Sequence, residues 1–313
     1  MTGKIPVAAV VGATASGKTG LAVFLAETFG GEVVSCDSMQ IYRGMPIATA
    51  QPTEAEMRGV PHHLIGFLDP AETYSAARYC RDAAAVIRDV YGRGRLPIVC
   101  GGTGLYADAL LRGVTFAEVP SDDALRAQLN ERFAREGGDA LLRELRAVDP
   151  ESAAKLHPAD GKRIVRALEV YRLTGQTISH FNAVSHDRPS EYDVLWLETS
   201  WPDRQALYDR IDRRVDAMLD AGLAREARAF YAANPGGTAK AAIGYKELKP
   251  WLDGEKSFEA AVADLKTATR RYAKRQLTWF RRHDDIIRLR CDAPDAAQQA
   301  AQCVRARFFP QDA

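Results

Sequence analysis

The stretch Gly12-Ala13-Thr14-Ala15-Ser16-Gly17-Lys18-Thr19 decides how the rest of the chain is interpreted. It follows the apolar run Ile5 to Val11 and precedes a helical pattern over Leu21 to Phe29, so the predicted order is strand, loop, helix. The spacing G-x-x-x-x-G-K-[ST] lets backbone N–H groups turn inward on phosphate oxygens, adds a lysine cation and offers a hydroxyl that can hold Mg²⁺. The following helix N-terminus favours the same anion. We therefore expect residues 12–19 to bind a phosphorylated ligand.

Composition predicts a globular protein without a global charge bias. The chain has 313 residues, 46% of them hydrophobic, which is enough for one large domain or two ordinary ones. The formal net charge is +1, so a nucleic-acid partner would have to meet a local basic patch. The five cysteines form no C-x-x-C pair and no cluster with metal-ligand spacing, which favours reduced thiols. No signal-like segment or membrane-spanning run is evident, so we expect a cytoplasmic protein.

Two further loops follow apolar runs and are expected near the phosphate loop. The run Glu32 to Asp37 ends in a carboxylate, and the carboxyl ends of parallel strands open onto the ligand crevice. Three interpretations of Asp37 remain open: a Mg²⁺ ligand, a general base, or a helix N-cap. The run Leu96 to Cys100 leads into Gly101-Gly102-Thr103-Gly104, which is either a second ligand loop or a plain turn. The fold class predicted is α/β, a P-loop NTPase-like core with a mostly parallel sheet.

The chain changes character in its middle. Residues 116–190 lack strand-like runs and are rich in charge and helical periodicity, which predicts a helical insertion between core segments 1–115 and 191–313. Arg163 and Arg166 lie away from the apolar face of one predicted helix, and pattern alone favours a solvated surface. The core resumes with the strand-like run Asp193 to Glu198.

Two basic patterns follow in the last segment. Arg210 and Arg214 lie one helical turn apart, a spacing that suits either an oligophosphate clamp or ion pairs with neighbouring aspartates. Residues 266–282 combine basic side chains with tyrosine and tryptophan and contain no acid, a pattern that suits an RNA backbone with unpaired bases. A basic helix packed on acidic helices is the alternative.

Taken together, the motifs resemble those of the bacterial tRNA dimethylallyltransferase family. In order along the chain they are Gly12 to Thr19, Val34-Ser-Cys-Asp-Ser-Met-Gln-Ile-Tyr42, Val60-Pro-His-His-Leu-Ile65, Gly101-Gly-Thr-Gly-Leu-Tyr106, Arg163-Ile-Val-Arg-Ala-Leu-Glu-Val-Tyr171, Ala242-Ile-Gly-Tyr-Lys-Glu-Leu248 and Thr269 to Arg281. One departure is Ile47-Ala-Thr-Ala-Gln-Pro52, because the family often has lysine where this chain has Gln51.

The resemblance implies transfer of a dimethylallyl group from dimethylallyl diphosphate to N6 of the adenosine just 3′ of the anticodon. Asp37 would accept the N6 proton, Thr103 would orient Asp37 or the diphosphate, and Lys18 would stabilise the leaving group together with Mg²⁺ held by Thr19. The diphosphate would be bound by Gly12, Ala13, Thr14, Ala15, Ser16, Gly17, Lys18, Thr19, Arg210 and Arg214.

The partner implied is the tRNA anticodon stem-loop, over which the helical insertion would close. Expected tRNA contacts are Asp37, Ser38, Met39, Gln40, Thr103, Lys162, Arg163, Ile164, Val165, Arg166, Ala241, Ala242, Ile243, Gly244, Tyr245, Lys246, Lys274, Arg275, Gln276, Leu277, Thr278, Trp279, Phe280 and Arg281. We expect a monomer that does not associate with membranes. Two alternatives remain: a P-loop kinase or NTPase, and a non-catalytic RNA-binding protein with a regulatory P-loop.

Overall fold

The computed structural model describes residues 3–113, 122–184 and 190–310. The chain divides into two compact units, one formed by residues 1–111 and 191–313 and the other by residues 112–190. Each unit has its own hydrophobic core. Among the described residues, no helix is long and apolar enough to span a bilayer.

The first unit is built on a six-stranded sheet with the order β3-β2-β4-β1-β5-β6. All recorded strand pairs are parallel, which confirms the predicted α/β fold class. The strands are β1 (Ile5–Gly12), β2 (Glu32–Ser35), β3 (His62–His63), β4 (Pro97–Gly101), β5 (Tyr192–Ser200) and β6 (Ile287–Arg290). The runs predicted as strands before the phosphate loop, before Asp37 and before the glycine loop are therefore β1, β2 and β4.

Helices cover both faces of this sheet because β1 is apolar on both faces. Val7, Ala9 and Val11 belong to one core, whereas Ala8 and Val10 belong to another. The first core packs α3 (Ala76–Gly92) and α4 (Gly104–Leu111), and the second packs α1 (Lys18–Phe29) and α14 (Ala296–Phe308). A short helix, α2 (Glu54–Met57), follows the loop after β2.

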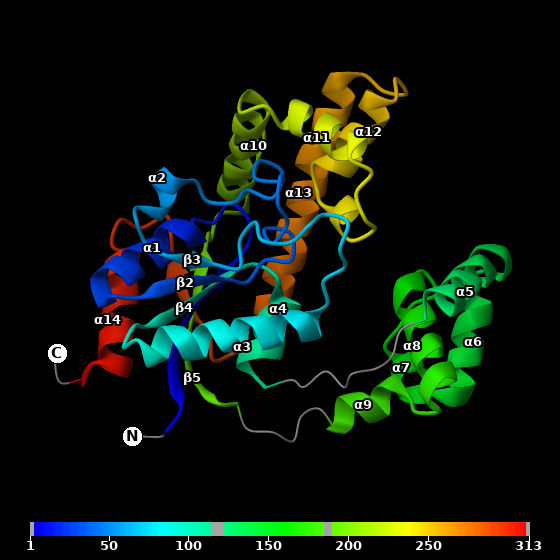
Figure 1. Ribbon diagram of the computed structural model, residues 1–313, viewed down its shortest axis with the longest axis horizontal. Coiled ribbons are helices and arrows are strands. Elements are labelled where there is room, and N and C mark those ends of the chain that lie inside the picture. Colours follow the sequence, from blue (N-terminus) through cyan, green and yellow to red (C-terminus); the bar gives the residue numbers. More distant parts are fainter. Residues whose placement is uncertain (1–2, 114–121, 185–189, 311–313) are drawn as a thin grey trace. The chain divides into compact units, whose positions relative to one another are not determined.

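The remaining helices of this unit lie beyond the carboxyl edge of the sheet (Figure 1). They are α10 (Arg204–Asp220), α11 (Leu223–Ala232), α12 (Tyr245–Leu252) and the 23-residue α13 (Phe258–Phe280), with a 3₁₀ turn at Ala239–Ala241. Buried residues of these helices continue the core that covers one face of the sheet. This arrangement places α10 and α13 beside the loops that leave β1, β2 and β4.

The second unit is helical. Its helices are α5 (Asp123–Glu136), α6 (Gly138–Val148), α7 (Pro150–Ala154), α8 (Gly161–Thr174) and α9 (Ile178–Val184). Its core contains leucines of α5 and α6 together with Ile164, Val165 and Leu168 of α8. Glu169 is fully buried and forms ion pairs with Arg126 and Arg166. Since removing either arginine would leave a buried carboxylate poorly paired, this triad holds α5 against α8.

Candidate active site

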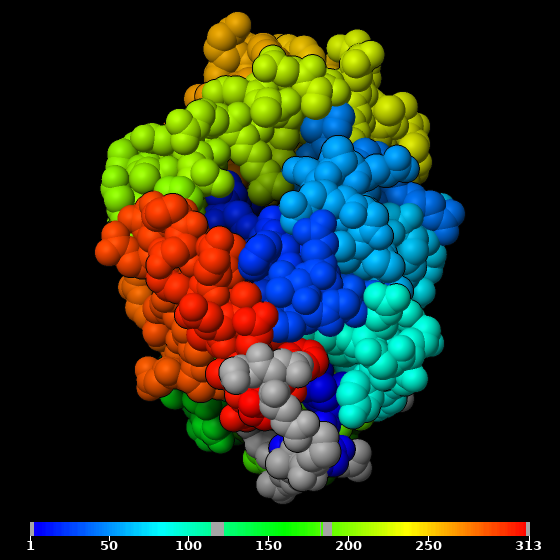
Figure 2. All heavy atoms as spheres, turned by 90° about the vertical axis from the view of Figure 1, so that its left-hand side faces the viewer, coloured from blue at the N-terminus to red at the C-terminus, as the bar shows by residue number. Residues whose placement is uncertain are grey.

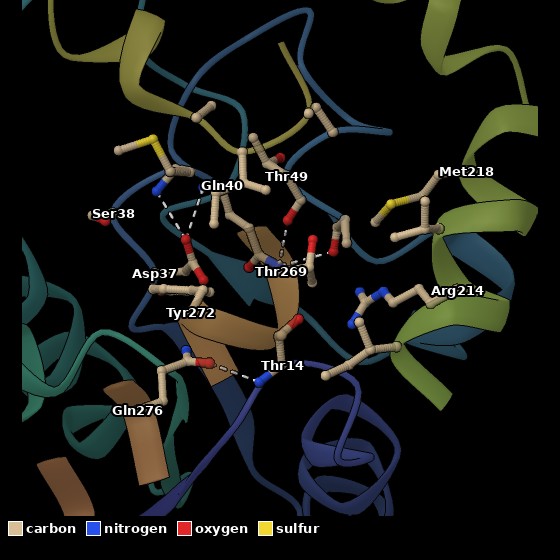
Figure 3. A pocket seen from close by; sticks show the side chains of 18 of the residues that line it. Thr14, Asp37, Ser38, Gln40, Thr49, Arg214, Met218, Thr269, Tyr272 and Gln276 are labelled. Carbon is tan, nitrogen blue, oxygen red and sulfur yellow. Dashed lines mark hydrogen bonds between the residues drawn. The ribbon is translucent and has the colours of Figure 1, made fainter. Parts of the chain in front are cut away.

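A cavity of about 250 Å³ opens at the carboxyl edge of the sheet. Its walls come from the phosphate loop, the loop after β2, the start of the glycine loop, the segment 241–246, α10 and α13. Figure 3 shows Asp37 on one side of the cavity and Arg214 reaching in from α10 on the other. Lys18 and Thr19 line the same space. The structure thus brings the amine of Lys18 and the hydroxyl of Thr19 together with the Asp37 carboxylate and the Arg214 guanidinium, which come from other parts of the sequence.

The phosphate loop is held from β5 and from the segment that follows it. The hydroxyls of Ser16 and Thr199 share a buried hydrogen bond of 2.5 Å, and the indole N–H of Trp201 donates to the Ser16 carbonyl at 3.1 Å. A Cβ at Gly12 would lie 2.7 Å from Thr199 Oγ1, and the φ of Gly12 is +140°, so this position requires glycine. Sequence reasoning missed Thr199 and Trp201, because no local motif marks them.

Arg210 contacts the same loop from α10. Its Nε donates to the Ala15 carbonyl at 3.0 Å, and its guanidinium lies 4.5 Å from the centre of the Trp201 ring. Ala15 has a φ of +62°, a conformation that costs energy for an L-residue, so a tie to its carbonyl helps to hold it. Of the two arginines predicted as a clamp, Arg210 therefore braces the loop, whereas Arg214 lines the cavity.

Lys18 and Arg214 make the phosphate end of the cavity electropositive. Burial, with a smaller contribution from Arg214, lowers the pKa of Lys18 to about 8, while Asp37 opposes the shift. Burial also lowers the pKa of Arg214, but a guanidinium stays charged at neutral pH. Since burial removes both cations from solvent, a bound anion would supply favourable interactions that water cannot.

Outside the cavity, an open recess continues this positive surface. It is lined by Gly17, Lys18 and Thr19 at the start of α1, by Glu56, and by Arg210, Arg213 and Arg214 of α10. Figure 2 shows a hollow between the yellow-green surface of α10 and the blue surfaces of α1 and α2. The recess gives a small anion a route to the phosphate loop.

Asp37 is fixed by its own loop. Its Oδ1 accepts the backbone N–H groups of Met39 at 2.8 Å and Gln40 at 3.4 Å, which is a local turn and not a helix start (Figure 3). The helix N-cap interpretation left open by the sequence is therefore wrong, since turns and no helix follow Asp37. Among the described residues, no hydrogen bond to the second oxygen of this carboxylate is recorded, and Asp37 lines the cavity.

Thr103 holds this loop from the neighbouring strand end. Its Oγ1 accepts the backbone N–H of Ser38 at 3.1 Å, and its own N–H donates to the Cys36 carbonyl at 3.2 Å. Thr103 therefore contacts the loop that carries Asp37, and it is not among the described residues that line the cavity. Tyr272 of α13 does line the cavity, and burial together with the nearby Asp37 carboxylate raises the pKa of its phenol.

The loop from Gln40 to Pro52 is braced by two side chains that the sequence did not single out for this role. The Gln51 amide donates to the carbonyls of Gln40 at 2.9 Å and Tyr42 at 2.8 Å. The Glu226 carboxylate accepts the N–H groups of Ile47 and Ala48, both at 2.8 Å. Gln51 thus ties two main-chain carbonyls of this loop together.

The wall that α10 presents to the cavity beyond Arg214 is apolar. Ile211, Val215 and Met218 line it at helical spacing, and Leu223 and Leu265 extend it. The cavity therefore combines an anion site at one end with room for a small apolar group next to it.

The residues predicted to contact tRNA differ in exposure. Half-buried ones are Asp37, Ser38, Met39, Gln40, Thr103, Arg166, Ile243, Leu277 and Trp279. Exposed ones include Lys162, Arg163, Ala241, Lys246, Lys274, Arg275, Thr278 and Arg281. Buried ones are Ile164, Val165, Ala242, Gly244, Tyr245, Gln276 and Phe280. Tyr245 donates to Glu226 at 2.8 Å, and Trp279 donates to Asp108 at 2.8 Å. The exposed basic side chains are the ones available to a phosphate backbone.

Within the described ranges, no group of three or more His, Cys, Asp and Glu side chains could hold a metal ion. For a divalent ion beside the phosphate loop, the Thr19 hydroxyl would be available together with water and the oxygens of a bound phosphate, a donor set that suits Mg²⁺, and the Asp37 carboxylate lines the same cavity.

Comparisons with known proteins agree on one family. A model described as IPP transferase matches residues 40–283, and one described as isopentenyl transferase matches residues 5–65. A tRNA dimethylallyltransferase of Geobacillus kaustophilus is 47% identical over 298 residues, covering 95% of this chain and 93% of the relative. One from Caldanaerobacter subterraneus is 45% identical over 287 residues, covering 90% of each chain.

Solved structures give the same result. The tRNA isopentenylpyrophosphate transferase of Bacillus halodurans has a TM-score of 0.74 and 39% identity, covering 99% of this chain and 98% of that one. A eukaryotic dimethylallyltransferase described as acting on tRNA has a TM-score of 0.82 and 30% identity, covering 98% of this chain and 80% of that one.

Proposed function

We propose that this chain, which belongs to the IPP transferase family, transfers a dimethylallyl group from dimethylallyl diphosphate to N6 of the adenosine 3′ of the anticodon in tRNA. The transfer is proposed to occur in the cavity beside Asp37. The single observation that carries the proposal is the order of groups around that cavity. Cations and the phosphate loop lie at one end, an apolar wall lies next to them, and Asp37 faces the same space. The cations and the phosphate loop suit the diphosphate of a five-carbon allylic donor, and the apolar wall suits its hydrocarbon part. Asp37 suits an amine nucleophile, which must lose a proton.

The reaction follows from these groups. The N6 lone pair attacks the allylic carbon, the bond between that carbon and the diphosphate oxygen breaks, and diphosphate leaves with the bonding electrons. Asp37 accepts the proton that N6 loses. Lys18, Arg214 and the backbone N–H groups at the start of α1 stabilise the charge that grows on the departing diphosphate.

Thr19 is the protein residue proposed to hold Mg²⁺, and the donor's phosphate oxygens supply further ligands. When bound, Mg²⁺ neutralises part of the leaving group's charge. The proposal is supported by Thr19 lining both the cavity and the outer recess.

The tRNA partner is proposed to present its anticodon loop to the open side of the cavity. Exposed Lys246, Lys274, Arg275 and Arg281 of the first unit, and Lys162 and Arg163 of the second, are suited to phosphate contacts. The target adenosine must leave its stack to reach Asp37, which costs little in a single-stranded loop. We propose that the chain acts as a monomer in the cytoplasm, where its tRNA substrate is found.

The kinase or NTPase alternative lacks support from the comparisons, in which the relatives are tRNA dimethylallyltransferases. The deciding experiment incubates the purified protein with unmodified tRNA, Mg²⁺ and dimethylallyl diphosphate, followed by nucleoside mass spectrometry. Parallel reactions replace the donor with ATP or add a chelator in excess over Mg²⁺. A five-carbon mass gain on adenosine, lost with chelator, supports the proposal; phosphate release from ATP without that product contradicts it.

A further inference from the structure

Gln276 lies on the basic helix α13 but does not face the solvent. Its side chain is 5% exposed, whereas Lys274 and Arg275 beside it are exposed. Its Oε1 accepts the backbone N–H of Thr14 at 2.8 Å, and its Nε2 donates to the Gly102 carbonyl at 2.9 Å. Figure 3 shows the amide pointing at the phosphate loop. One side chain therefore bridges the loop after β1 and the loop after β4.

The fit at Gly102 is close. A Cβ built there would lie 2.0 Å from Gln276 Nε2, and the backbone of Gly102 does not need a left-handed conformation. The second glycine of the G-G-T-G motif is thus explained by the approach of Gln276, and not by a turn that only glycine can adopt. Because the bridge is buried, each of its hydrogen bonds would leave an unsatisfied polar group if the partner were lost.

We infer that Gln276 is a positioning residue, which fixes the phosphate loop relative to the glycine loop and so keeps the donor site ready for diphosphate. This inference rests on the proposed function of the cavity. The motif resemblance implied that Gln276 contacts tRNA. We assign its side chain instead to the loops that form the donor site. The N–H of Thr14 is committed to Gln276, so the diphosphate is met by N–H groups later in the loop. Helix α13 then serves two ligands, with its exposed face for tRNA and its buried face for the donor site.

The test measures the two ligands separately on the full-length protein. Inorganic diphosphate with Mg²⁺ is titrated by calorimetry, and unmodified tRNA is titrated by filter binding. Gln276→Met keeps the side-chain length but removes both hydrogen bonds, so diphosphate affinity should fall about tenfold, with tRNA affinity within about threefold. In turnover, the KM for dimethylallyl diphosphate should rise more than kcat falls. Lys274→Ala is the matched neighbour and should weaken tRNA binding alone.

A second variant approaches the same contact from the other side. Gly102→Ala should displace Gln276 and weaken diphosphate binding in the same way. Its effect should largely disappear in a Gln276→Ala background, where the 2.0 Å contact is gone and the Gly12 carbonyl at 3.2 Å is the close neighbour that remains. This comparison remains informative even if each single variant is less stable. A general loss of stability would make the effects of the two substitutions add in the double variant, whereas loss of one shared contact would not.

Two results would overturn the inference while leaving the proposed function intact. One is a Gln276→Met protein that binds diphosphate like wild type but loses tRNA affinity. The other is full additivity of Gly102→Ala and Gln276→Ala. If the wild-type chain bound no diphosphate, the proposed donor site and the inference would both be wrong.

Discussion

The Thr103 hydroxyl accepts the backbone N–H of Ser38 at 3.1 Å, so the loop after β4 holds the residue next to Asp37. This contact crosses between two strand ends that are neighbours in the sheet, β4 and β2. The position of Asp37, the proposed base, therefore depends on Thr103, which is distant from it in the sequence.

Thr103→Val should lower kcat about tenfold, because the N–H of Ser38 loses its acceptor and the Asp37 loop gains freedom. Thr103→Ser should retain most of the activity, since it keeps the hydroxyl. Steady-state kinetics with both substrates varied checks this, and tRNA affinity should stay near wild type. Equal activity of the valine and serine variants would contradict a role for the hydroxyl.

Arg214 and Arg210 should differ in what they contribute. Arg214→Gln removes a cation from the cavity wall and should weaken diphosphate binding by about 10- to 100-fold, the range expected for a hydrogen bond to a charged group. Arg210→Gln removes the tie to the Ala15 carbonyl and should have a smaller effect. Calorimetric titration of both variants with inorganic diphosphate measures the two losses of affinity. A larger loss in Arg210→Gln than in Arg214→Gln would assign the diphosphate clamp to Arg210.

Exposed Arg163 should contribute one phosphate contact from the helical unit. Arg163→Ala should weaken tRNA binding and reduce the slope of log affinity against log salt by about one. Lys155→Ala is the control from the same unit, because Lys155 is also exposed and ion-paired, with Glu151 at 2.8 Å as Arg163 is with Asp160 at 3.4 Å, but it lies outside the segment predicted to contact tRNA. Equal salt slopes for wild type and Arg163→Ala would remove Arg163 from the tRNA interface.

The acid stability of the fold should depend on Glu32 of β2. Hydrogen bonds from Arg93 and then His63 lower the pKa of this carboxyl from its usual value to about 2, against an opposing effect of burial. A folded-state pKa below the unfolded value means that the ionised carboxylate adds stability above pH 4.5 and loses it as the pH falls toward 2.

Glu32→Gln should therefore lower the urea midpoint at pH 7, and the gap from wild type should narrow as the pH falls from 4.5 toward 2. Glu27→Gln is the control, because the pair of Glu27 with Arg58 is exposed and contributes little. A gap that stays constant over this range would show that Glu32 acts through packing alone.

The sequence predicted the features that depend on short-range patterns, such as hydrophobic periodicity and motif spacing. Strand periodicity and the spacing of residues 12–19 located β1, the phosphate loop and α1, and the parallel sheet then placed Asp37 at the same edge. The bridge from Gln276 to Thr14 and Gly102 could not be predicted, because it depends on how α13 packs against loops more than 170 residues away. Helix α14 and strand β6 were also not anticipated, as their patterns are short or weakly amphipathic.

The candidate tRNA residues show a related limit. A family motif marks which residues recur, but it does not separate surface from core. Tyr245 and Phe280 fall within such motifs, yet both are fully buried and pack within the core. Only the three-dimensional packing distinguishes them from Lys274 and Arg281.

The central claim is that Asp37 accepts the N6 proton in the cavity beside the phosphate loop. The most direct measurement is the single-turnover rate of dimethylallyl transfer by Asp37→Asn and wild type, with both substrates saturating and tRNA affinity measured in parallel. We predict a rate lower by about 10² to 10⁴, the usual contribution of a general base, with tRNA affinity changed only a few fold. A wild-type rate in Asp37→Asn would contradict the assignment and require another group to take the proton.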